Sequence, residues 1–154
     1  MDIRALSEKD FSAVRDIVCQ VHGLHVQNRP DVYRDSDPFG RDYFEFLRSD
    51  TGTFVLVAED GDKIAGLCIV TLREPPKNPV MKPRRVAFME DLCIDECYRR
   101  RGVGTELFRE AAAQARQRGA ETLELMVWSF NTSAIEFYRR MGLTPRSIIM
   151  EQKL

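Results

Sequence analysis

A basic, glycine-containing turn constrains the fold of this chain most, because it joins a predicted strand to a predicted helix. The apolar run 86–94 has the length and composition of a buried strand. Residues 105–118 repeat apolar side chains at the spacing of an amphipathic helix. Between these two segments lies Arg99-Arg100-Arg101-Gly102-Val103-Gly104. A strand, a tight turn and a helix in this order predict parallel pairing across the helix.

The turn has the chemistry of a phosphate-binding site. The first backbone N–H groups of a helix lack intrahelical partners, and the helix dipole adds partial positive charge there. Gly102 and Gly104 carry no Cβ, so the backbone can approach an anion closely. Three arginines add forked donors that suit phosphate oxygens. Leu107 stands where a dinucleotide fingerprint needs its third glycine, and no P-loop string occurs. The alternative interpretation is a basic turn exposed to solvent.

The remaining pattern predicts an α/β fold, with a mixed central sheet flanked by helices on both faces. Further strands are predicted at residues 2–6, 53–59, 63–72, 121–128 and 147–153. Further helices are predicted from Ser7 to Gly23, from Asp37 through Leu47, and over residues 131–141. The order is therefore β-α-α-β-β-β-α-β-α-β, with antiparallel pairing across the Asp60-Gly61 turn.

Length, composition and charge narrow the function classes. The 154 residues suit one domain spanning 1–154, and 44% apolar with 31% charged residues predicts a folded globule. A net charge of −1 gives no argument for a nucleic-acid partner. The chain lacks an apolar run of about 20 residues and a signal-peptide pattern, so a cytoplasmic protein without a membrane partner is expected. No metal is expected, because His22, His25, Cys93 and Cys97 lack the usual ligand spacing.

Three segments together resemble one known family. The turn fits the pattern R-x-x-G-x-G, through Arg99, Gly102 and Gly104. Residues 88–94, Phe-Met-Glu-Asp-Leu-Cys-Ile, resemble the strand that precedes such a turn. Residues 131–138, followed by Gly142-Leu143, resemble a closing N-x-x-A-x-x-x-Y helix. In this order they resemble the GNAT superfamily of N-acetyltransferases over nearly the whole chain, which implies the GNAT acyl-CoA N-acyltransferase fold.

The resemblance also implies an activity and a set of site residues. It implies acetyl-CoA as the co-substrate and transfer of the acetyl group to a primary amine by direct attack in a ternary complex. It assigns Tyr138 to the thioester sulfur and Glu90 to the role of general base, often through a water. The pantetheine arm is expected to pair with the backbone of Leu92, Cys93 and Ile94 and to bond Asn131. The residues implied in pyrophosphate binding are Arg99, Arg100, Arg101, Gly102, Val103, Gly104 and Thr105.

The residue types support these roles on chemical grounds. A phenol can protonate a leaving thiolate. Asn131 and Tyr138 are seven residues apart, so they share one helix face about 10 Å apart along the axis. Glu90 and Asp91 interrupt an apolar strand, and only one of two successive strand residues can enter a given cleft. Burial raises the pKa of the carboxyl that enters. The alternative to an acid role for Tyr138 is packing in the core. For Asp91 the favoured interpretation is a structural carboxylate that bonds backbone amides, Arg84 or Arg85.

The acceptor and any protein partner are less constrained. A small-molecule or peptide amine is expected to enter beside residues 25–43, where acidic side chains balance the basic ones. Tyr33 is a candidate to line that groove, and Trp128 a candidate for its wall or for the core. The sequence leaves open a homodimer. The alternative function is a non-catalytic acyl-CoA-binding sensor or regulatory module, which keeps the turn but does not need Glu90 or Tyr138.

Overall fold

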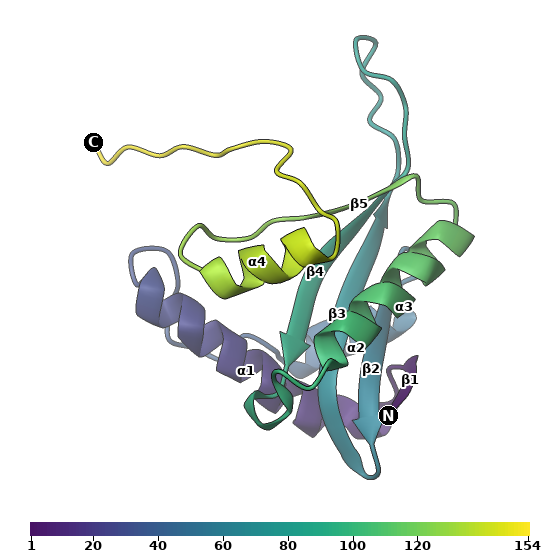
Figure 1. Cartoon of the computed structure of the whole chain (residues 1–154), viewed down its shortest axis with the longest axis vertical. Coiled ribbons are helices and arrows are strands. Elements are labelled where there is room, and N and C mark those ends of the chain that lie inside the picture. The colour runs from purple at the N-terminus through teal and green to yellow at the C-terminus, as the bar shows by residue number, and fades with distance from the viewer.

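A five-stranded sheet forms the centre of the computed structural model, which describes residues 1–154 (Figure 1). The strands are β1 (Asp2–Ala5), β2 (Thr53–Asp60), β3 (Lys63–Arg73), β4 (Val86–Ile94) and β5 (Thr122–Leu125). Their spatial order equals their sequence order. Neighbours from β1 to β4 pair antiparallel, whereas β4 and β5 pair parallel. The predicted mixed sheet and the parallel crossover are thus confirmed.

Helices cover both faces of this sheet. They are α1 (Phe11–Asn28), α2 (Arg41–Ser49), α3 (Val103–Gln117) and α4 (Thr132–Arg140), with short 3₁₀ turns at Glu8–Asp10 and Glu96–Tyr98. Side chains of α3 and α4 pack on one face with Leu56, Cys68 and Met89. Side chains of α1 and α2 pack on the other face with Val57, Ile69 and Cys93. Because both faces are buried, β2 and β3 read as near-continuous apolar runs.

The N-terminal helices differ from the prediction at their ends. α1 does not end at Gly23 but continues to Asn28, where the Arg29 N–H donates to the His25 carbonyl. Gly23 is exposed with open space around it, and a helical glycine there costs only about 1 kcal/mol. Asp37 does not cap α2. Its carboxylate accepts from the Phe39 N–H and bonds Arg15, and the helix begins at Arg41.

Two C-terminal predictions are wrong. β5 ends at Leu125 instead of residue 128, because its pairing with β4 stops at Met89 and Leu125. The predicted last strand, 147–153, has no partner strand, and residues 144–154 are exposed and carry no regular secondary structure. The predicted element order therefore holds through α4. No helix in the structure combines the length and the apolar character that crossing a membrane requires.

Candidate active site

The site begins where β4 and β5 separate. Their register runs from Val86 opposite Thr122 to Met89 opposite Leu125, and no pairing follows. The other edge of β4 stays bonded to β3 as far as Ile94. Residues 90–94 therefore present one unpaired backbone edge toward the gap, and an extended ligand can bond such an edge as an added strand. The predicted pantetheine-binding residues, Leu92, Cys93 and Ile94, lie on this edge.

A β-bulge in β4 sets which carboxylate faces which side of the sheet. Ile69 lies opposite Asp91 and Val70 lies opposite Met89, so Glu90 is the extra residue. Residues directly opposite each other in a sheet share a face, and Ile69 belongs to the core beneath α1 and α2. Asp91 therefore points to the α1–α2 face. Glu90 is exposed and lies 3.4 Å from the guanidinium of Arg73.

Asp91 is the carboxylate for which the sequence favoured a structural role. It is half-buried and forms no hydrogen bond or ion pair, so its predicted bonding to amides, Arg84 or Arg85 is wrong. Burial, with the neighbouring charge of Glu90, raises the pKa of Asp91 to about 6. The sequence signal was the pair of acids in an apolar strand, but the bulge that decides between them follows from strand pairing.

The predicted phosphate turn has the required backbone. Arg100 and Gly102 adopt left-handed conformations, with φ of 64° and 89°. The amides of Arg100, Arg101 and Gly102 bond no group in the protein, and those of Val103 and Gly104 open α3. The Thr105 amide, also assigned to this cradle, donates to the Gly102 carbonyl at 2.9 Å. The free donors thus run from residue 100 to residue 104.

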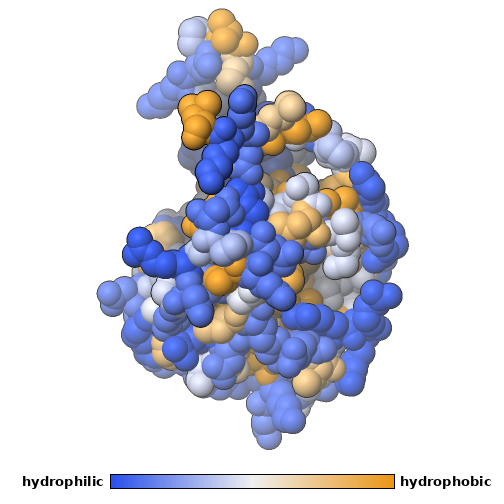
Figure 2. All heavy atoms as spheres, turned by 90° about the vertical axis from the view of Figure 1, so that its left-hand side faces the viewer, coloured by the Kyte–Doolittle hydropathy of each residue, from blue (hydrophilic) through white to orange (hydrophobic).

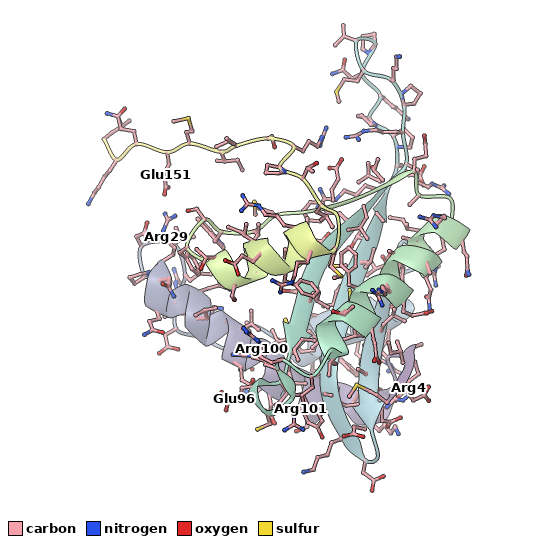
Figure 3. All side chains as sticks on the ribbon, viewed as in Figure 1. Arg4, Arg29, Glu96, Arg100, Arg101 and Glu151 are labelled. Atoms are coloured by element: carbon pink, nitrogen blue, oxygen red, sulfur yellow. The ribbon has the colours of Figure 1, made fainter.

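The three arginines of the turn differ in their surroundings. Arg99 donates from Nε to the Ile94 carbonyl at 3.2 Å, which ties the turn to the end of β4. Arg101 lies over the ring of Tyr98, with its guanidinium 5.5 Å from the ring centroid. Arg100 and Arg101 form no ion pair and lie on the turn that leads into α3 (Figure 3). Two guanidinium groups are therefore available to an anion at this turn.

α4 closes the gap from the α3 side. Asn131 caps the helix, because its side-chain oxygen accepts from the Ala134 amide at 3.2 Å, and its NH₂ group remains free as a donor. The Tyr138 ring packs against Phe108 and Phe137, with centroids 6.4 and 5.3 Å away. The Tyr138 hydroxyl bonds no group in the protein. Burial first, and then the acidic groups Cys68, Cys93 and Asp91, raises the pKa of Tyr138 above its usual value.

Two titratable side chains lie on opposite faces of the sheet near the point where β4 and β5 separate. Asp91 belongs to the α1–α2 face and Tyr138 to the α3–α4 face. The charge of Asp91 raises the pKa of Tyr138, and with burial it also raises that of Tyr43 on α2. The groups therefore interact electrostatically across the point where β4 and β5 part. A reaction there can use a base on one side and an acid on the other.

Aromatic side chains gather beside the gap on the α1 side. The Trp128 indole donates to the Tyr33 hydroxyl at 2.8 Å, and His25 stacks on the Tyr33 ring at 5.1 Å. Arg29 lies over Trp128 at 4.6 Å and is paired with Asp31. Burial, aided by His22, lowers the pKa of His25. Tyr33 and Trp128, from distant parts of the sequence, are thereby brought together as one wall.

One open hollow, with a volume of about 180 Å³, lies elsewhere on the molecule. It is lined by residues of α2, β1, β2 and the C-terminal end of α3, including Leu47, Thr53 and Arg118. β1 and β2 lie at the opposite edge of the sheet from β5. Because this hollow contains none of the predicted site residues, the β4–β5 gap remains the candidate site.

A basic turn with free backbone amides lies at the end of β4, next to the strand edge that β5 leaves unpaired. Comparison with known proteins places the chain more narrowly. Residues 20–143 match the acetyltransferase (GNAT) family model. The chain therefore belongs to the acetyltransferase (GNAT) family, and the predicted resemblance is confirmed.

Individual relatives agree with this placement. The chain is 37% identical over 108 residues to streptothricin acetyltransferase of Streptomyces lavendulae, covering 70% of this chain and 52% of that protein. It is 36% identical over 67 residues to L-ornithine N5-acetyltransferase of Arabidopsis thaliana, covering 44% and 29%. The matches thus span about half or less of these curated relatives. A crystal structure of a mutant BH1408 protein from Bacillus halodurans superposes with a TM-score of 0.97 at 29% identity, over 100% and 99% of the two chains.

Proposed function

We propose that this chain transfers the acetyl group of acetyl-CoA to a primary amine of a small molecule or peptide, by direct attack in a ternary complex. The observation that carries the proposal is an unpartnered carboxylate on one face of the sheet and an unpartnered phenol on the other, where β4 and β5 stop pairing. Family membership supports the reaction class. The free amides of residues 100–104 and the guanidinium groups of Arg100 and Arg101 are suited to the pyrophosphate.

The proposed reaction uses the two faces in turn. Asp91 takes a proton from the bound ammonium group, and the freed amine nitrogen attacks the thioester carbonyl from the α1–α2 side. The carbon–sulfur bond then breaks, and the thiolate takes a proton from the Tyr138 hydroxyl on the α3–α4 side. The amide nitrogen gives up its remaining extra proton, which restores the phenol. Asp91 takes the role that sequence resemblance assigned to Glu90, because Glu90 is exposed beside Arg73. Direct attack needs both reactants bound at once, and we place both at the unpaired edge of residues 90–94.

The acceptor is proposed to be a protonated amine carried on a largely uncharged or cationic body. Asp91 and Glu90 give the gap negative charge, which favours the arrival of a cation. Arg29 is already paired with Asp31 and Glu151, so it is not free to hold a substrate carboxylate. The Tyr33–Trp128 wall offers aromatic contact to the substrate body. Streptothricin and ornithine, named as substrates of the two relatives, both carry amines.

Changing Gly102 to alanine is expected to weaken acetyl-CoA binding. Gly102 has a φ of 89°, and an alanine in that conformation costs about 1–2 kcal/mol of backbone strain. If the free variant relaxes to another conformation, binding must pay this strain, which corresponds to roughly a tenfold loss of affinity for acetyl-CoA. Gly61→Ala is the matched control, because Gly61 has φ of 62° and open surroundings in the β2–β3 hairpin. Calorimetric titration with acetyl-CoA measures the affinity of both variants. Equal affinities in the two folded variants would show that the turn at Gly102 does not bind acetyl-CoA.

A further inference from the structure

A glutamine on α1 reaches the segment that leads from β4 into the phosphate turn. Gln20 lies on α1, which packs on the face of the sheet opposite α3. Its side-chain Nε2 donates to the Asp95 carboxylate at 3.0 Å, and its Oε1 accepts from the Glu96 amide, also at 3.0 Å. Figure 3 shows Glu96 and Arg101 on this part of the chain, next to α1. One side chain thus bonds two residues that lie 75 and 76 positions away in the sequence.

The two partners of Gln20 require an amide side chain. A carboxylate only accepts hydrogen bonds and a backbone N–H only donates them, so the side chain between them needs one donor and one acceptor. Glutamine has both. The bond from Gln20 lowers the pKa of Asp95, and the Cys97 amide, which donates to the same carboxylate at 2.8 Å, lowers it further. Asp95 is therefore held as a carboxylate between α1 and the backbone of its own turn.

The part of α1 that carries Gln20 is fixed against the sheet. Ile17 and Val18 are buried and belong to the same core cluster as Cys93 of β4. Ile17 and Gln20 are three residues apart, so they are neighbours on the helix surface. The Gln20 amide therefore extends toward the end of β4 from a rigid base.

The other bonds of residues 95–99 come from the sheet or from the turn itself. The Asp95 amide donates to the Ala65 carbonyl of β3 at 3.0 Å, and Arg99 bonds the carbonyl at the end of β4. Gln20 is the one residue of another helix that hydrogen-bonds this segment. Without it, the start of the phosphate turn is attached to the sheet alone. With it, the turn is attached to the sheet and to α1.

We propose that Gln20 is a positioning residue for acetyl-CoA, because its bridge to Asp95 and Glu96 holds the phosphate turn in the conformation that binds the pyrophosphate. This role rests on the proposed binding of acetyl-CoA at that turn. When only a fraction of the free protein has the binding conformation, the apparent Kd rises by the inverse of that fraction. Loss of the bridge therefore weakens acetyl-CoA binding but leaves the rate of the bound complex unchanged.

Gln20→Met removes the bridge and keeps the length of the side chain and its helix propensity. The Kd and the KM for acetyl-CoA are expected to rise roughly tenfold, the effect of losing hydrogen bonds of ordinary net strength, while kcat at saturating acetyl-CoA stays the same. Gln114→Met is the matched control, because Gln114 is also half-buried on a helix but bonds only Glu110 of its own helix. Calorimetric titration and steady-state kinetics measure the two variants.

The Gln20→Met variant is expected to fold. Gln20 is half-buried and outside both core clusters. Figure 2 shows largely hydrophilic atoms on the side of the molecule where α1 lies, so water can reach the groups that lose their partner. Circular dichroism should therefore show an unchanged fold.

A shortened donor separates positioning of the turn from a general loss of structure. S-acetylpantetheine carries the thioester and the pantetheine arm but lacks the pyrophosphate. Gln20→Met should lower kcat/KM for acetyl-CoA roughly tenfold and leave kcat/KM for S-acetylpantetheine unchanged. The strand edge proposed for the arm does not depend on Gln20, because β4 stays paired with β3 as far as Ile94.

An exchanged pair provides the rescue. Gln20→Glu alone places a second carboxylate against Asp95 and should weaken acetyl-CoA binding at least as much as Gln20→Met. Adding Asp95→Asn reverses the donor and the acceptor, and asparagine can still accept from the Cys97 amide. The double variant is therefore expected to regain most of the lost affinity, which a role in overall stability does not predict.

Two results would overturn this role while leaving the proposed function intact. The Gln20→Met variant could bind acetyl-CoA as tightly as the unaltered chain, which would show that the bridge does not position the turn. Alternatively, Gln20→Met could reduce kcat/KM for both donors equally with no recovery in the double variant, which would make Gln20 a residue of general structure. An unaltered chain that does not bind acetyl-CoA would instead contradict the proposed function itself, and with it this role.

Discussion

Replacing Asp91 with asparagine is expected to lower kcat by roughly 10²–10⁴-fold, the range for loss of a positioned general base. Asparagine keeps the size of the side chain on the α1–α2 face but cannot accept the proton of the attacking amine. The backbone bulge at Glu90 should be unaffected, because it depends on the β3–β4 register. Steady-state kinetics with saturating acetyl-CoA and a primary amine measures the effect.

The pH profile separates this role from a structural one. Burial raises the pKa of Asp91 to about 6, so the base is ionised above that pH and protonated below it. The wild-type kcat/KM should therefore fall as the pH drops through about 6, and the Asp91→Asn variant should lose this acid limb. Glu90→Gln is the control, because the Glu90 charge contributes to the raised pKa of Asp91. It should move the limb to lower pH and leave the rate near neutrality intact. Loss of the limb in Glu90→Gln alone would assign the base to Glu90.

Tyr138→Phe is expected to reduce kcat by roughly 10²–10⁴-fold with little change in the KM for acetyl-CoA. Phenylalanine retains the packing against Phe108 and Phe137 but removes the hydroxyl that protonates the thiolate. Tyr98→Phe is the control, since it makes the same change beside the phosphate turn.

The raised pKa of Tyr138 adds a second readout. A phenol whose pKa lies above its usual value stays protonated, and thus able to donate, at a pH where an exposed tyrosine ionises. The wild-type rate should therefore show no alkaline loss near pH 10. Wild-type turnover in Tyr138→Phe would make Tyr138 a packing residue only.

Local patterns predicted much of this fold because they are properties of single elements. The 86–94 strand, the Arg99–Gly104 turn and the helix after it were readable from apolar spacing and glycines. The end of α1 was not, because a glycine in an exposed helix position is tolerated when the next turn continues to pack. The missing last strand has a different cause. Residues 147–153 have strand composition, but a strand needs a paired neighbour, and this segment pairs with none.

The site shows the same division between local and tertiary information. The phosphate turn and the Asn131–Tyr138 spacing depend on one segment each, and sequence placed both correctly on their elements. The choice between Glu90 and Asp91 depends on a bulge opposite Ile69 and Val70, which only the pairing of two strands defines. The joining of Tyr33 to Trp128 likewise depends on tertiary contact between residues 95 positions apart.

The most direct test of acetyl transfer is a balance of products. The full chain is incubated with acetyl-CoA and, separately, a polyamine, ornithine and a peptide with a free N-terminus, and both free CoA and acetylated amine are quantified. Direct attack in a ternary complex predicts one acetylated amine for each CoA released, and no release of CoA when amine is omitted. If acetyl-CoA binds but no amine in the series is acetylated, the chain is an acyl-CoA-binding module and not a transferase. A burst of CoA without amine would instead contradict direct attack.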